Sequence, residues 1–249
     1  GGDGRQAALN RPRAVSTSLE RLSAADGTVS TLFPRYVYVA DTGNHRVRRI
    51  ELVGEVQCCD MNGDPDVYIS YDQGGVIDTV VGTGEAGISN RDGPAATFQL
   101  DAPSGMVTLS DGRVLVSDTG NHRIVEYDPT TGQVRTLLGK VLSLTGGAFE
   151  GAPGYTPYGV SANHALGNNV ELNGPFSLTS FPLSVLSEGA EGDIVFFADR
   201  DNHKARAYFA GSFAPGDTFA PLAEAVVDIA GSGIRGYGGD GDNAAMALL

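Results

Sequence analysis

Between residues 105 and 138, short apolar runs alternate with polar turns. This pattern predicts strands near 105–109, 113–118, 123–128 and 134–138. The turns between them have good hairpin chemistry: Ser110-Asp111-Gly112, Thr119-Gly120-Asn121 and Pro129-Thr130-Thr131-Gly132. Four such strands make one twisted antiparallel sheet with an apolar face on each side. No part of the chain has a convincing helical period.

The pattern occurs three times. Residues 37–50 (VYVADTGNHRVRRI), 114–127 (VLVSDTGNHRIVEY) and 194–207 (IVFFADRDNHKARA) align by eye on their shared aspartate, asparagine and histidine. Each copy is preceded by a Leu-x-x-Pro element, at residues 9–12, 100–103 and 172–175. A sheet that is apolar on both faces is not stable alone, so neighbouring sheets must stack on it. Radial stacking of four-stranded sheets predicts an all-β fold built of β-propeller blades.

The repeats divide the chain into three four-stranded blades within one propeller segment that spans residues 1–249. The expected blades cover about residues 13–82, 103–139 and 175–231, and the expected spacers cover 83–102, 140–174 and 232–249. Gly-rich stretches open two of the spacers, GTGEAG at 82–87 and GSGIRG at 231–236. These stretches superficially match a dinucleotide fingerprint, but that fingerprint requires a following helix, which this sequence does not predict.

The Asp-(Thr/Arg)-x-Asn-His-(Arg/Lys) units resemble NHL repeats, and the Gly-rich spacers resemble those of bacterial-type and algal NHL proteins. The third copy departs most, because Asp199-Arg200-Asp201 replaces Asp-Thr-Gly and Ala205 replaces an aliphatic residue. The resemblance implies a propeller of usually six blades. Since three blades cannot close a ring, we expect either more chain or several copies of this chain in one assembly. The chain also opens abruptly on Gly1-Gly2-Asp3-Gly4, as if cut from a longer protein.

Composition narrows the class of protein further. Among 249 residues, 35 are glycine and the formal net charge is −13, so the surface repels nucleic-acid backbones. The resemblance also raises RNA binding as an alternative. In a protein of this net charge, RNA binding would require the positive charges to gather on one face. No apolar window is long enough to span a membrane, and no signal peptide is visible at the start.

The repeat-motif residues are the first candidate site. They are Asp41, Asn44, His45, Arg46, Asp118, Asn121, His122, Arg123, Asp199, Asn202, His203 and Lys204. Three histidines could form a zinc site, and the family that the chain resembles includes a zinc-using amidating lyase. However, equivalent positions of a propeller lie on a circle. We therefore favour a structural role, in which Asp and Asn bond backbone amides at a tight turn and the following basic residue lies along the next strand.

An insertion between the third and fourth strands of the first blade carries a second set of candidates. The oxygen-bearing residues Asp60, Asn62, Asp64 and Asp66 alternate as in a calcium loop, although Pro65 replaces the required Gly. The Gly-Asp-Gly spacers are a weaker calcium candidate. The neighbours Cys58 and Cys59 form either a vicinal disulfide, separate bonds, or two free thiols, and an extracellular setting favours oxidation. His164, outside the repeats, is expected to be an exposed loop residue.

The sequence predicts a non-enzymatic binding or structural scaffold without a cofactor, calcium aside. Its partners would be proteins, glycans or further copies of itself, in an extracellular or cell-surface setting. Rigid scaffolds recognise partners through loops, so the insertions at 53–75 and 141–170 are the expected contact points. No Gly-x-Ser-x-Gly nucleophile motif is present. The alternative is a metal-dependent propeller lyase or hydrolase with its site on the central axis.

Overall fold

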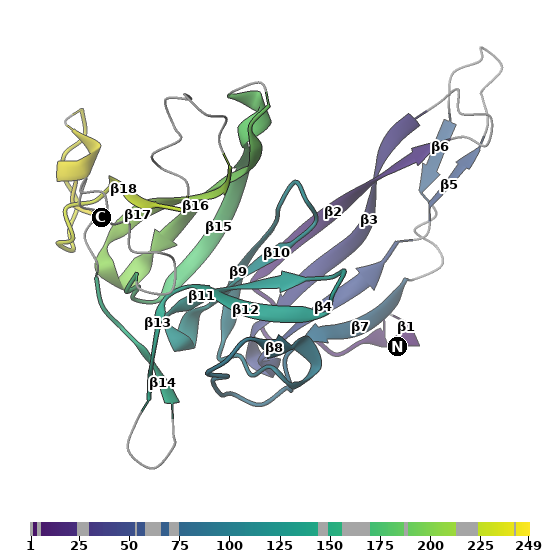
Figure 1. The fold of residues 1–249 in the computed structure, drawn as a ribbon, viewed down its shortest axis with the longest axis horizontal. Helices are drawn as coiled ribbons and strands as arrows, with labels where there is room; N and C mark the ends of the chain where they lie inside the picture. The colour runs from purple at the N-terminus through teal and green to yellow at the C-terminus, as the bar shows by residue number, and fades with distance from the viewer. Residues whose placement is uncertain are drawn as a thin grey trace.

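A computed structural model describes residues 2–3, 6–23, 30–52, 54–57, 66–69, 75–143, 149–155, 170–186, 189–212, 224–241 and 243–249. Within these residues the chain forms antiparallel sheets and short 3₁₀ turns, with no α-helix. The three larger sheets follow one another in chain order (Figure 1). The all-β, antiparallel prediction is therefore confirmed.

The central sheet has the strand order β8-β12-β11-β10-β9. Its strands are β8 (Gly93–Pro94), β9 (Pro103–Thr108), β10 (Val114–Asp118), β11 (Arg123–Asp128) and β12 (Gln133–Leu138). The four strands predicted from the apolar pattern are confirmed to within two residues. The short strand β8, which pairs Gly93 with Val134, was not predicted, because a two-residue strand has no apolar alternation to reveal it.

The first and third sheets have related arrangements. The first has the order β1-β7-β4-β3-β2 and the third the order β15-β16-β17-β18. Their strands are β1 (Gly2–Asp3), β2 (Ala14–Ser23), β3 (Ser30–Asp41), β4 (Arg46–Glu51), β7 (Val76–Val81), β15 (Pro175–Pro182), β16 (Glu191–Asp199), β17 (Lys204–Ser212) and β18 (Val226–Ala230). The expectation of four strands per sheet holds for the third sheet, whereas β1 and β8 each add a fifth strand to theirs.

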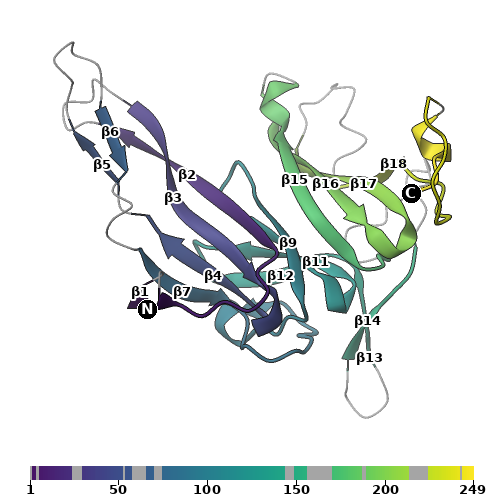
Figure 2. The same ribbon diagram turned by 180° about the vertical axis from the view of Figure 1, so that it is seen from behind.

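The central sheet is buried on both faces. Val116 and Val125 face the first sheet, where they pack in a cluster with Tyr38 and Val47. On the opposite face, Leu115 lies in a second cluster with residues of β16 and β17. This sandwiching explains why β10 is apolar at nearly every position instead of alternating. Figure 2 shows the three sheets from behind, with their innermost strands β2, β9 and β15 closest together.

The innermost strands approach each other closely. A Cβ atom at Gly105 of β9 would overlap the backbone carbonyl oxygen of Phe176 in β15. On the other side, the Ser16 and Thr108 hydroxyls form a 2.9 Å hydrogen bond between β2 and β9. The absence of a side chain at Gly105 thus lets neighbouring sheets meet along their inner edges.

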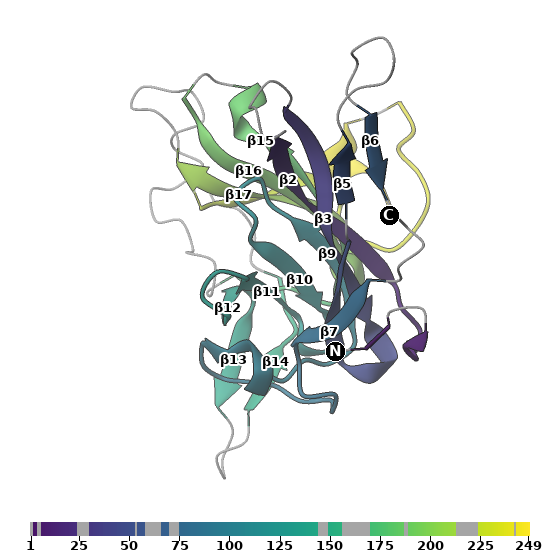
Figure 3. The ribbon, with the colours of Figure 1, turned by 90° about the vertical axis from the view of Figure 1, so that its right-hand side faces the viewer.

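Two hairpins lie in regions where the sequence predicted no strands. Strands β5 (Gly54–Gln57) and β6 (Asp66–Ile69) pair within the insertion of the first sheet. Strands β13 (Lys140–Ser143) and β14 (Phe149–Ala152) pair at the start of the expected second spacer and project away from the sheets (Figure 3). Four-residue strands are too short for apolar periodicity to reveal.

Candidate functional site

The three repeat turns share one backbone conformation. Each aspartate ends a strand, a single 3₁₀ turn follows, and the histidine takes a left-handed conformation, with φ of 51° at His45 and 52° at His122 and His203. Positive φ is uncommon for residues other than glycine, but histidine is among those that adopt it more often. The turn therefore has the same shape in all three repeats despite the change from Thr-Gly to Arg-Asp in the third.

Each aspartate bonds the Leu-x-x-Pro element that precedes its own sheet. Asp118 Oδ1 accepts the Asp101 backbone N–H at 2.6 Å, and Asp41 and Asp199 accept the N–H groups of Asn10 and Asn173, each at 2.7 Å. We expected the bonded amides to lie at the turn itself. They lie instead on the segment that leads into the first strand, so each aspartate joins the start of its sheet to the end of the second strand.

The asparagines donate their hydrogen bonds. Asn44, Asn121 and Asn202 each donate through Nδ2 to the Oδ2 atom of the aspartate three residues earlier, at 2.8–2.9 Å. Asn121 Nδ2 also donates to the carbonyl oxygen of Gly87, and Asn202 Nδ2 to that of Gly154. Each asparagine therefore bonds through Nδ2 as a donor, to the aspartate of its own turn and, for Asn121 and Asn202, to a backbone carbonyl of the preceding spacer. This nitrogen holds the preceding spacer against the turn.

In the central repeat, a buried arginine compensates the aspartate. Arg123 Nε lies 2.8 Å from Asp118 Oδ2, and neither side chain is exposed. Burial raises the pKa of the Asp118 carboxyl, while Arg123, Asn121 and the Asp101 N–H act in the opposite direction. Arg123 also donates to the carbonyl oxygens of Ser89 and Gln99. One cation therefore connects the turn to the spacer.

In the other two repeats, the arginine that meets the aspartate stands three places after the histidine instead of one. Arg206 Nη1 lies 3.1 Å from Asp199 Oδ2, and Arg48 Nη1 lies 3.9 Å from Asp41 Oδ2. Lys204, directly after His203, pairs with Asp228 at 3.0 Å. Alternate residues of a strand point to the same face, so the residue one or three places after the histidine can supply the charge. The sequence does carry a signal for this difference. The first and third repeats read Arg-x-Arg and Lys-x-Arg after the histidine, whereas the central repeat reads Arg-x-Val.

The histidines connect one sheet to the next. His45 Nδ1 accepts the Ala102 N–H and His122 Nδ1 accepts the Gly174 N–H, each at 3.1 Å. Beside them, the threonine after each aspartate donates to the next sheet: Thr42 to the Pro103 carbonyl at 2.6 Å and Thr119 to the Pro175 carbonyl at 2.7 Å. His45 and His122 thus belong to different junctions. No three His, Cys, Asp or Glu side chains of the described part of the chain are placed to hold a metal ion.

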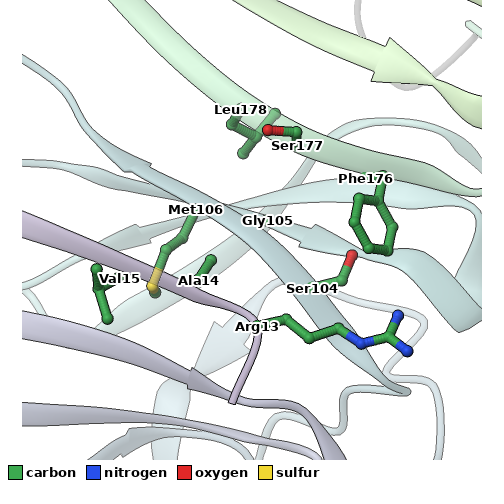
Figure 4. A pocket seen from close by; sticks show the side chains of 9 residues that line it. All are labelled: Arg13, Ala14, Val15, Ser104, Gly105, Met106, Phe176, Ser177 and Leu178. Atoms are coloured by element: carbon green, nitrogen blue, oxygen red, sulfur yellow. The ribbon is translucent and has the colours of Figure 1, made fainter. Parts of the chain in front are cut away.

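Two cavities lie next to these junctions. One, of about 180 Å³, is lined by β2, β9 and β15 and by Arg13, which precedes β2 (Figure 4). The second, of about 360 Å³, is here called the basic groove and lies between the first and second sheets. The residues that define the basic groove are Asn10, Arg11, Arg13, Thr42, Gly43, His45 and Ala102. Arg13 contributes to both cavities, so the two adjoin.

Phe176 stands at the same end of the smaller cavity as Arg13 (Figure 4). The guanidinium carbon of Arg13 lies 5.4 Å from the centre of the Phe176 ring, and that of Arg200 lies 5.5 Å from it. Arg200 makes a two-bond ion pair with Asp201, which compensates its charge. Sequence reasoning missed Arg11, Arg13 and Phe176, because they belong to no repeated motif.

Several predicted site residues lie outside the described residues. Cys58, Cys59, Asp60, Asn62 and Asp64 belong to this group. The same holds for His164 and for most of the expected contact loops, and Asp66 is described only through its backbone as the first residue of β6. The disulfide and calcium hypotheses therefore stay predictions.

A family model described as NHL repeat matches residues 100–127. These residues run from the Leu-x-x-Pro element through β9, β10 and the Asp118 turn to β11. The chain contains an NHL repeat. The turns at Asp41 and Asp199 reproduce the hydrogen bonds of this NHL repeat between the aspartate, its asparagine and the Leu-x-x-Pro element. The NHL repeat and the antiparallel sheets together support a β-propeller.

Comparison with known proteins gives no further specificity. The chain resembles auxiliary nutrient binding proteins of Bacteroides thetaiotaomicron (12% identity, TM-score 0.26) and Bacteroides ovatus (12%, 0.25), covering 82% and 80% of this chain and 56% and 55% of theirs. A Bacteroides thetaiotaomicron protein named as a candidate phosphatase is 11% identical, with a TM-score of 0.28. This match covers 87% of this chain and 49% of that protein. The chain thus spans about half the length of these proteins. No curated protein matched.

Proposed function

We propose that this chain is a non-enzymatic scaffold of NHL blades that binds protein or glycan partners outside the cell or at its surface. The supporting observation is how the polar groups of the repeats are used. The Asp118 carboxylate alone takes part in three bonds, to the Asp101 N–H, the Asn121 amide and the Arg123 guanidinium. Groups committed to holding sheets together make a rigid frame, which leaves recognition to grooves and loops between the sheets.

We further propose that the three sheets are blades of a larger propeller assembled from copies of this chain. Met106, on the central-sheet face that meets the first sheet, is 4% exposed. The corresponding residue of the first sheet, Val15, lies opposite Val39 on the face directed away from the central sheet and is 68% exposed. A blade face of a second copy would cover this apolar surface as the first sheet covers Met106.

The enzyme alternative requires a metal at the axial end of the blades. Elemental analysis of the purified protein separates the two proposals. A scaffold is expected to contain no stoichiometric zinc and to be inactive towards ester, phosphoester and peptide-amide substrates. Stoichiometric zinc together with turnover of any of these substrates would contradict the scaffold proposal.

The binding role is tested directly with an array of neutral and acidic oligosaccharides, alongside cross-linking to surface proteins of the source cells. We expect saturable binding to at least one member of either panel, and we expect it to disappear when the protein is thermally unfolded. Binding that survives unfolding, or the absence of saturable binding on both panels, would contradict the proposal. None of the described helices is long and apolar enough to cross a membrane.

A further inference from the structure

The basic groove carries positive charge that the repeat architecture does not require. Arg11 and Arg13 correspond to Ala102 and Ser104 before the second sheet, and to Gly174 and Phe176 before the third. Arg11 also has a left-handed backbone, with φ of 51°, a conformation in which glycine, as at Gly174, is unstrained. The other two sheets carry small or uncharged residues at these positions, so the fold does not require the charge of the two arginines.

These arginines have no acidic partner in the described part of the chain. Other arginines there do pair, such as Arg113 with Asp111 and Glu126. No ion pair involves Arg11 or Arg13 among the described residues, although the whole chain has 30 acidic and 17 basic residues. Both side chains are exposed at the groove. Two guanidinium groups thus remain available to an external anion.

The shape of the groove favours a compact ligand. Its volume of about 360 Å³ falls within the usual range of small-molecule sites, and turn residues such as Gly43 and His45 line it. Since no strand edge lines it, an extended peptide could not bind there by adding a strand. The net charge of −13 opposes a long polyanion such as RNA. Guanidinium groups bind a planar carboxylate through paired N–H bonds, so a polar, sugar-sized ligand that carries a carboxylate suits the groove.

We propose that the basic groove binds the uronic-acid residue of an acidic oligosaccharide, with Arg11 and Arg13 holding its carboxylate. Asn10 lies beside them, and its amide already donates to the Gly43 carbonyl at 3.0 Å, which fixes the groove wall. His45 is held by the Ala102 N–H, which its Nδ1 accepts at 3.1 Å. This inference rests on the proposed binding role and names the ligand class.

Titration calorimetry with trigalacturonate and neutral trigalactose tests the inference. We expect the protein to bind trigalacturonate and not trigalactose. Arg11→Ala and Arg13→Ala should each weaken binding about five- to tenfold, since each removes a charge-assisted hydrogen bond. The matched control is Arg235→Ala, which removes an exposed arginine of the C-terminal spacer and should leave affinity unchanged. Because Arg11 and Arg13 are exposed, all three variants should unfold at the wild-type temperature.

Each contrary result identifies which proposal fails. Equal binding of the two sugars, or full binding by the Arg11→Ala and Arg13→Ala variants, would overturn the groove assignment while leaving the scaffold proposal standing. Binding of an Asp-rich peptide but not of trigalacturonate would also overturn it. The scaffold proposal fails separately, if neither the oligosaccharide array nor the cross-linking experiment finds a partner.

Discussion

At the residue scale, many of the buried polar groups lie in the repeat turns. Asp41, Asp118 and Asp199 are all fully buried, and each accepts both a backbone N–H and an asparagine amide. A buried carboxylate is costly unless it is paired and hydrogen-bonded, so these bonds form a network in which each member depends on the others.

The Asp118–Arg123 pair offers the clearest energetic test. Asp118→Ala should lower the free energy of unfolding by about 3–5 kcal/mol, because it leaves Arg123 buried without its partner. The double variant Asp118→Asn/Arg123→Met should lose less than the sum of its two single variants. Urea denaturation measures all of these. The control is Asp111→Asn in an exposed ion pair, where a loss below about 1 kcal/mol is expected. Strict additivity of the single losses would contradict the coupling.

The buried Tyr208 phenol should make the stability of the fold depend on pH in the alkaline range. Burial raises the pKa of the Tyr208 phenol to about 12. The folded state therefore keeps this proton more tightly than the unfolded state, whose phenol titrates near pH 10. The stabilisation is complete below pH 10 and is lost as the pH rises towards 12, by up to about 2 kcal/mol. Urea unfolding at several pH values should show a shallower loss for Tyr208→Phe. The exposed Tyr237→Phe should match the wild type, and parallel profiles for all three proteins would contradict the assignment.

At the scale of the elements, the apolar pattern was sufficient for long strands with buried neighbours. The predicted strands of the central sheet agree with β9–β12, because nearly every residue of β10 and β11 lies in a core. The pattern was insufficient for β8, which is held by pairing with the distant β12, and for the β13–β14 hairpin, whose four-residue strands are too short to show alternation. The motif likewise identified the turn aspartates but not their cations, since Arg48 and Arg206 are chosen by the side of the strand that faces the turn.

The junction histidines give a test at this scale. His122→Ala should cost about 1 kcal/mol, because the Gly174 N–H loses its acceptor. His203→Ala is the matched control. Its backbone φ is also 52°, but within the described residues no N–H of a following sheet donates to it. Thermal unfolding of both variants should show the larger loss for His122→Ala, and equal losses would contradict the role of the histidine as a link between sheets.

At the scale of the whole molecule, each sheet depends on its neighbours. The central sheet is covered on both faces, whereas the face of the first sheet directed away from it exposes Val15. This arrangement is typical of repeat proteins, in which a unit becomes stable by stacking on the next.

Self-association is the corresponding prediction. Sedimentation velocity should show a concentration-dependent oligomer for the wild-type chain. Val15→Glu should shift it towards monomer, because it places a charge in the proposed blade interface. Leu142→Glu, on the projecting β13–β14 hairpin, is the control and should associate like the wild type. A monomer at all concentrations, or equal association by all variants, would contradict assembly through this face.

The sequence by itself determined the class of fold, the phase of the repeats and the strands of the central sheet. These follow from local alternation and from turn chemistry, which depend on residues close together in the chain. Tertiary structure alone decided which arginine meets each buried aspartate, which N–H each histidine accepts, and that Arg11 and Arg13 share a groove with His45. The physical reason differs between these contacts. The histidine and groove contacts join residues far apart in sequence and exist only after the sheets have stacked, whereas the aspartate meets the nearby arginine whose side chain lies on the strand face turned towards it.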